Sequence, residues 1–299
     1  MLSLKKMVLA GAATMMGLGV LTAGQAQERV NPLTLLEEAP ADAWRTVPQD
    51  DLLYVDLPSG RVIIETRADF APAHVERIKT LARQGFYDGT IFHRVIEGFM
   101  AQGGDPTGTG TGGSDYPDLS AEFVRSLDSV ADLTVLGRDR RTSEIGFIGP
   151  VPVGAQPDSL KDFFTGGNLG LWGMHCKGVM SMARAGDPNS ANSQFFLMFD
   201  DSRRALDQRY TVWGRVIDGF ENARRINRGE PPDRPTPINR MRVGSDVPAD
   251  DQVDIQVLRT DGALFEEFLR AAGYLSENDF IDNVCSITVP VKVNGEIEL

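Results

Sequence analysis

The sequence has little positive charge and few histidines. Its 299 residues include 30 Lys and Arg against 42 Asp and Glu, so the formal net charge is −12. No cluster of Lys and Arg interrupts the acidic background, and a nucleic-acid partner is therefore not expected. The three histidines, His74, His93 and His175, lack the spacing of metal ligands, which argues against a zinc site.

Long apolar runs are missing after residue 26, so we expect no membrane span in the rest of the chain. Residues 1–26 have the pattern of a signal peptide, because two lysines precede the apolar run Met7–Ala23 and small residues precede Gln27. A retained membrane anchor is the alternative, but the run is short and rich in Gly and Ala. We expect cleavage and an exported chain, which in a Gram-negative source would reside in the periplasm.

Only two cysteines are present, Cys176 and Cys285. Export permits a disulfide between them, and two separate buried thiols are the alternative. We favour the disulfide, because a free exposed thiol outside the cytoplasm is at risk of oxidation. The bond would tie the C-terminal tail to the body of the protein.

The rest of the chain predicts many short strands and few helices. The segments LLYVDL and RVIIET flank a Pro-Ser-Gly turn and predict a hairpin, and a helix is expected from Pro72 to Gly85. Residues 27–50 predict an irregular arm, and residues 114–172 a long, partly structured insertion. Residues 246–299 predict a tail with one amphipathic helix. This pattern favours a closed antiparallel barrel or a sandwich.

The glycine-rich segment GTGTGG, residues 108–113, is not a phosphate-binding loop. Such a loop follows a strand, opens a helix and usually carries Lys followed by Ser or Thr, and none of these features is present here. We interpret the segment as a flexible, closely packed loop.

The segment FHRVIEGFMAQGG places a cation among apolar residues. If a three-residue turn at Glu97–Phe99 closes a hairpin, Arg94 lies opposite Gln102 and Ile96 opposite Met100, all on one face. A partly buried arginine that pairs with a carboxylate is the alternative interpretation. The block SMARAGDPNSANSQFFLM adds Gln194 and Phe196 on one face of a second strand.

These blocks, together with GTGTGG and LDQRYTVWGRV, resemble the cyclophilin family of peptidyl-prolyl cis–trans isomerases. The resemblance implies a mainly β fold, an eight-stranded antiparallel closed β-barrel capped by two helices. It also implies no cofactor and no metal. We therefore expect an isomerase domain over 51–245, interrupted by the insertion 114–172, with the extension 246–299 packed on it.

The resemblance also implies a site. Arg94 and Gln102 match the catalytic positions of the FHR and GFM-x-Q motifs. The residues that match the family's substrate pocket are Phe99, Met100, Ala183, Arg184, Gln194, Phe196, Leu206 and Tyr210. Three positions depart from the common pattern: Ala205 stands where many members have Trp, Tyr210 where many have His, and Arg184 replaces a common Asn.

The expected chemistry is rotation about X-Pro bonds in proline-containing polypeptides. A fixed guanidinium can donate a hydrogen bond to the prolyl nitrogen as it pyramidalises, with no nucleophile or acid–base pair. We expect a monomer that assists the folding of exported proteins without membrane or nucleic-acid contacts. The alternative is a proline-pocket binding module, a chaperone or scaffold with little turnover.

Overall fold

The computed structural model describes residues 30–126, 133–139, 144–157, 159–160 and 169–298. The signal peptide expected in residues 1–26 lies outside the described residues. None of the helices in the described ranges is long and apolar enough to cross a membrane.

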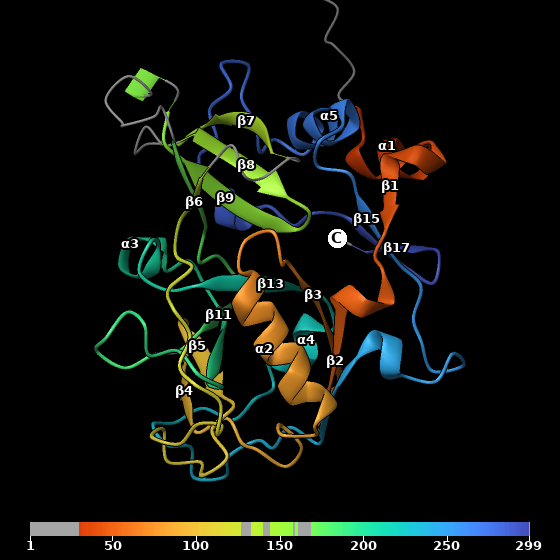
Figure 1. The fold of residues 1–299 in the computed structure, drawn as a ribbon. Coiled ribbons are helices and arrows are strands. Elements are labelled where there is room, and N and C mark those ends of the chain that lie inside the picture. The colour runs from red at the N-terminus through yellow and green to blue at the C-terminus, as the bar shows by residue number, and fades with distance from the viewer. Residues whose placement is uncertain (1–29, 127–132, 140–143, 158, 161–168, 299) are drawn as a thin grey trace, which may run out of the picture.

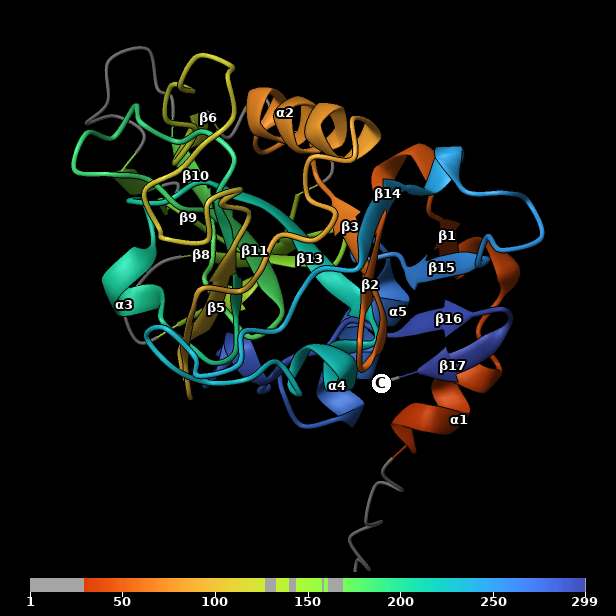
Figure 2. The ribbon, with the colours of Figure 1, turned by 90° about the horizontal axis from the view of Figure 1, so that it is seen from below.

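An eight-stranded antiparallel sheet forms the centre of the molecule (Figures 1 and 2). The hairpin predicted from LLYVDL and RVIIET is confirmed as two of its strands. In sheet order the strands are β14 (Arg240–Val243), β2 (Leu52–Leu57), β3 (Gly60–Thr66), β13 (Val212–Asp218), β11 (Val179–Met182), β12 (Phe195–Met198), β5 (Met100–Gly103) and β4 (Arg94–Ile96).

The sheet is curled but open, and the closed barrel that we expected is not seen. Its edge strands β14 and β4 do not pair with each other. The segment before β14 runs between the two edges and makes only isolated bridges, Val95 to Gly229 and Ile91 to Pro237. Because single bridges do not build a ladder, the sheet has the form of a half-barrel.

Two helices pack on opposite sides of this sheet (Figure 2). Helix α2 (Pro72–Arg83) begins with Pro at its first position and buries Val75, Ile78 and Leu81, as its periodicity predicts. The chain leaves it through Gly85, whose φ of +68° favours glycine. Helix α4 (Phe220–Ala223) is a single turn.

The insertion is more regular than the sequence indicated. Its described residues form a five-stranded antiparallel sheet in the order β6 (Arg125–Ser126), β10 (Gly170–Gly173), β9 (Val151–Ala155), β8 (Glu144–Ile148) and β7 (Thr134–Arg138). No strand is longer than five residues, so each carries too short an apolar pattern to be recognised alone. Phe147 of β8 packs edge-on against Phe265 of the tail, with ring centroids 5.3 Å apart.

The N-terminal segment is not an irregular arm, because it pairs with the C-terminal tail. It contains α1 (Pro32–Glu37) and β1 (Trp44–Thr46), and β1 begins a sheet in the order β1, β15 (Ile255–Leu258), β16 (Val291–Val293), β17 (Glu296–Glu298). The predicted tail helix is α5 (Ala263–Ala271). Helix α3 (Arg203–Leu206) lies along the chain between β12 and β13 of the central sheet. Short 3-10 helices cover Ala41–Ala43, Gln49–Asp51, Gly244–Asp246 and Val284–Ser286.

A disulfide and a buried arginine fasten the tail to the central sheet. Cys176, just before β11, is bonded to Cys285 with an S–S distance of 2.01 Å and a Cα–Cα distance of 4.8 Å. Arg215 of β13 donates hydrogen bonds to the carbonyls of Pro150, in the insertion, and Ile287, in the tail. Burial lowers the pKa of Arg215 to about 10, so the guanidinium stays charged at neutral pH.

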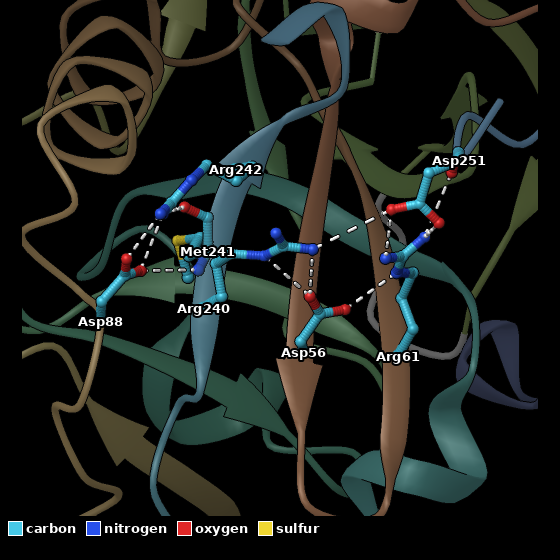
Figure 3. Close-up of polar contacts among 7 residues, drawn as sticks. All are labelled: Asp56, Arg61, Asp88, Arg240, Met241, Arg242 and Asp251. Atoms are coloured by element: carbon cyan, nitrogen blue, oxygen red, sulfur yellow. Dashed lines mark hydrogen bonds and ion pairs between the residues drawn. The ribbon is translucent and has the colours of Figure 1, made fainter. Parts of the chain in front are cut away.

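Charged side chains form a ladder across the outer face of the sheet edge (Figure 3). Asp56 of β2 pairs with Arg61 of β3 at 2.8 Å and with Arg240 of β14 at 3.1 Å. Arg61 also reaches Asp251 at 3.0 Å, which fixes the first loop of the tail beside the edge. Charges along an edge strand discourage further strand pairing.

Candidate active site

A cavity of about 200 Å³ opens between β4, β5, β11, β12 and α3. Every residue predicted from the sequence for the site lines it except Gln194. Its lining consists of Arg94, Phe99, Met100, Gln102, Ala183, Arg184, Phe196, Leu206 and Tyr210. A larger cavity of about 500 Å³ lies beside Arg215 and the tail, and none of the predicted site residues borders it.

Strand register brings the polar and aromatic groups together. Arg94 lies opposite Gln102 in the β4–β5 pair, and Gln102 lies opposite Phe196 in the β5–β12 pair. Residues directly opposite each other in antiparallel strands share a face, so the three side chains form one row across the sheet. The turn passes through Gly98, whose φ of +65° suits glycine. The hairpin register predicted from the sequence is confirmed.

The cavity floor is apolar and held from behind. Phe196 is 5% exposed, stacks on His175 with centroids 6.1 Å apart, and packs in a T-shaped arrangement with Tyr210, with centroids 5.6 Å apart. Met100 and Leu206 are also buried. A proline ring entering this cavity would therefore meet a rigid surface of aromatic and aliphatic groups.

His175 is buried in a chain of hydrogen bonds that the sequence did not reveal. Its Nδ1 lies 2.9 Å from Asp207 Oδ1, and its Nε2 lies 3.0 Å from Ser181 Oγ. This arrangement is that of a nucleophile and its base, but Ser181 is fully buried and its hydroxyl is also within hydrogen-bond distance of the Thr211 carbonyl. Because no substrate can reach Ser181, the three side chains support the cavity floor.

Arg94 stands at the rim of the cavity and is partly paired. Its Nε donates a hydrogen bond of 2.8 Å to Glu230 Oε2, and the two side chains are 41% and 49% exposed. The carboxylate pairing raised as an alternative is thus present, but at the surface. Within the described part of the chain the two Nη groups have no hydrogen-bond partner, so they remain available to a substrate.

Gln102 is held by Gln194 and not by Arg94. Its Nε2 donates a 2.9 Å hydrogen bond to Gln194 Oε1, and the described residues show no hydrogen bond between Gln102 and Arg94. Gln194 Nε2 in turn donates to the Gly112 carbonyl at 2.8 Å and to the Gly110 carbonyl at 3.1 Å. Gln194 therefore lies behind the cavity wall and connects Gln102 to the glycine-rich loop.

The glycine-rich loop is built around Asp105, a residue that the sequence analysis did not single out. This buried carboxylate accepts hydrogen bonds from the backbone N–H groups of Thr107, Gly110 and Gly112. A Cβ at Gly112 would lie 2.1 Å from Asp105 Oδ1, so the close approach requires glycine there. Burial opposes ionisation, but the hydrogen bonds from Thr107, Gly112 and Gly110 hold the pKa of Asp105 below its usual value.

We expect Asp105→Asn to lower the free energy of unfolding by about 2–3 kcal/mol, because an amide NH₂ cannot accept the N–H groups that the carboxylate accepts. The lowered pKa means that this carboxylate stabilises the fold fully above its unfolded-state pKa and loses the contribution as pH falls through the folded value. The Asn variant should therefore show a weaker loss of stability in acid.

Urea denaturation of both proteins between pH 7 and 3 measures this effect. Asp115→Asn, at an exposed position of the same segment, is the matched control and should leave the unfolding curve unchanged. Identical curves for Asp105→Asn and the unaltered protein would contradict the proposed role of Asp105.

A family described as "Cyclophilin type peptidyl-prolyl cis-trans isomerase/CLD" matches residues 52–245. The chain belongs to the cyclophilin family. A probable peptidyl-prolyl cis-trans isomerase of Brucella abortus is 37% identical over 191 residues, which are 60% of this chain and 73% of that protein. Human peptidyl-prolyl cis-trans isomerase-like 1 is 30% identical over 204 residues, 68% of this chain and 93% of that protein.

The crystal structure of cyclophilin AquaCyp293 from Hirschia baltica is similar over a larger part of the chain. Its TM-score is 0.74 at 38% identity, and the match covers 84% of this chain and 93% of that one. The family match over 52–245 covers 194 of 299 residues, about 65%, so the similarity to AquaCyp293 extends into the accessory segments. The enzyme is thus a cyclophilin-type peptidyl-prolyl isomerase with additions that at least one other cyclophilin partly shares.

Ala205 is the departure from the family pattern with the clearest consequence for inhibitors. It is exposed on α3, next to the pocket residue Leu206. The family resemblance implies that the Trp of other members at this position would contact cyclosporin, so we expect this cyclophilin to bind the drug weakly. Ala205→Trp should tighten inhibition on the order of tenfold, since an indole adds apolar contact area at the pocket edge.

Inhibition constants for cyclosporin on the two proteins test this prediction. Ala249→Trp, at an exposed alanine of the tail outside the cavity lining, is the control for non-specific effects of an added indole. Tight inhibition of the unaltered protein would show that Ala205 is wrongly aligned with the Trp of other family members.

Proposed function

We propose that Arg94 accelerates X-Pro isomerisation by donating a hydrogen bond to the prolyl nitrogen of the rotating amide. The observation that carries this proposal is a partly exposed guanidinium beside a cavity of about 200 Å³ with an apolar floor, both of its Nη groups lacking a hydrogen-bond partner among the described residues. Resonance gives the C–N bond double-bond character and a rotation barrier of ~18–20 kcal/mol. As the bond twists, resonance is lost and the nitrogen becomes a hydrogen-bond acceptor.

The pairing of Arg94 with Glu230 suits this role. Because only Nε is engaged, the carboxylate restrains the guanidinium and leaves both Nη groups of this cavity-lining residue without a hydrogen-bond partner among the described residues. An interaction available only to the twisted amide lowers the barrier without stabilising the planar ground state. Arginine fits the task, since its fork is rigid and always charged.

The remaining residues hold the substrate. Phe99, Met100, Phe196 and Leu206 supply apolar surface for the proline ring. Gln102 donates one N–H of its amide to Gln194, so within the described residues its second N–H and its Oε1 remain for a substrate carbonyl or N–H.

We propose that the substrates are exported proteins, reached after removal of residues 1–26. The charge and apolar pattern of that segment supports export. The disulfide between Cys176 and Cys285 supports an oxidising compartment, the periplasm in a Gram-negative source. We further propose that 51–245 acts as the isomerase domain of a monomer, with the insertion 114–172 and the extension 246–299 packed on it.

Turnover of a chain beginning at Gln27 tests the proposal. We expect faster cis–trans relaxation of an Ala-Ala-Pro-Phe anilide in proportion to enzyme concentration. Tight peptide binding without acceleration would instead identify a proline-pocket binding module or chaperone. Retention of the N-terminus at residue 1 in the protein recovered from its source would argue against export by a cleaved signal peptide.

A further inference from the structure

The cavity lining carries two cations and no carboxylate. Its charged members are Arg94 and Arg184, and its other members are neutral. Arg94 is neutralised at the rim by Glu230. Arg184 has no ion-pair partner within the described ranges, although the whole chain has a formal net charge of −12.

Arg184 is nonetheless fixed in place. Its guanidinium lies over two aromatic rings, with Cζ 4.6 Å from the centroid of Tyr210 and 5.5 Å from that of Phe123. Its Nε donates to the Arg209 carbonyl at 3.1 Å, and its Nη1 donates to the Ala185 carbonyl at 2.9 Å. Neutral carbonyls and π faces orient a cation without cancelling its charge.

The position of this cation relates it to the substrate path. Tyr210 lines the cavity and packs in a T-shaped arrangement with Phe196, so the guanidinium lies directly beside the surface that would hold the proline ring. A polypeptide whose proline fills the cavity must leave it on both sides, and Arg184 stands on one of them. The insertion contributes Phe123 to this arrangement, which connects it with the site.

We propose that Arg184 makes this enzyme selective for X-Pro segments that carry an Asp or Glu within two residues of the proline. The proposal rests on the proposed function, because it concerns the same site. A carboxylate brought beside Arg184 would meet a preorganised guanidinium whose Nη2 makes no hydrogen bond among the described residues. A lysine in the same place would face a like charge.

Matched peptides measure the selectivity at pH 7.5, where glutamate is ionised. Acetylated anilides of the form Ala-X-Pro-Phe, X-Ala-Pro-Phe and Ala-Ala-Pro-X carry Glu, its isostere Gln, or Lys at X. In at least one of the three series we expect kcat/KM for Glu to exceed that for Gln by about threefold, the size typical of an exposed ion pair. Lys should fall below Gln in the same series.

Variants assign the effect to one side chain. The ratio of Glu to Gln should fall to one in Arg184→Gln and invert in Arg184→Glu, whatever the absolute rates. Arg204→Gln makes the same charge change at an exposed position of α3 outside the cavity lining, and should keep the ratio of the unaltered protein. A ratio of one in all series, or an unchanged ratio in Arg184→Gln, would overturn the proposal.

The failure of the proposed function would look different. In that case the Ala-Ala-Pro-Phe peptide itself would show no acceleration. The dissociation constants of the same Glu and Gln peptides, measured by calorimetric titration, then decide the role of Arg184. The Glu peptide should bind about threefold more tightly than the Gln peptide to the unaltered protein, and equally tightly to Arg184→Gln.

Discussion

Arg94→Ala is expected to lower kcat/KM by about 10²–10³-fold, the usual effect of removing one donor aimed at charge that develops in the transition state. The lost hydrogen bond would be made only to the twisted amide, so kcat should fall and KM should change little. Arg94→Lys should recover part of the rate, because the charge remains but the rigid fork is lost.

The fold should survive this substitution. Arg94 is 41% exposed, and its one ion pair, with the half-exposed Glu230, is of a kind that contributes little to stability. Arg240→Ala is the matched control, since Arg240 lies on β14, the far edge strand of the same sheet, is 46% exposed and likewise pairs with a carboxylate. The control should keep full turnover. An Arg94→Ala protein with unchanged kcat/KM would refute the proposed mechanism.

The part of the site that the sequence predicted is the part encoded locally. Arg94 and Gln102 are eight positions apart in one hairpin, and alternation with a glycine turn is enough to place them opposite each other. Helix α2 could be predicted for the same reason, because its initial proline, its apolar face and its terminal glycine lie within 14 residues.

The part that the sequence did not predict depends on distant contacts. Glu230 reaches Arg94 across 136 residues. Strand β1 has three residues and pairs with β15, more than 200 positions away, so no local pattern distinguishes it from an arm. The open form of the sheet likewise depends on how residues 229–238 pass between two edges. The role of Asp105 could have been predicted from the sequence. An Asp that precedes alternating glycines favours a turn in which its carboxylate accepts hydrogen bonds from the backbone N–H groups that follow.

Opening the bond between Cys176 and Cys285 is expected to destabilise the protein by up to ~4–5 kcal/mol, because the bond closes a long loop in the unfolded chain. The two cysteines are 109 positions apart. The pairing of β1 with β15 and the hydrogen bond from Arg215 to Ile287 also hold the tail in place. We therefore expect the measured loss of stability to be smaller than this upper limit. A fall in Tm on the order of 10 °C would correspond to this loss.

Thermal unfolding of the protein with and without dithiothreitol measures the effect, and thiol titration of the denatured, unreduced protein should find no free thiol. The variant with Cys176→Ala and Cys285→Ala is the control, since its Tm should lie near that of the reduced protein and should not change when dithiothreitol is added.

Turnover should fall much less than stability when the disulfide is reduced. The tail binds the sheet beside Arg215, and the cavity beside Arg215 shares no lining residue with the cavity beside Arg94. His175, next to Cys176 and stacked on Phe196, connects the bond to the pocket floor, and its contacts with Asp207 and Ser181 hold it independently. Two free thiols in the unreduced protein, or equal losses of turnover and stability, would contradict this account.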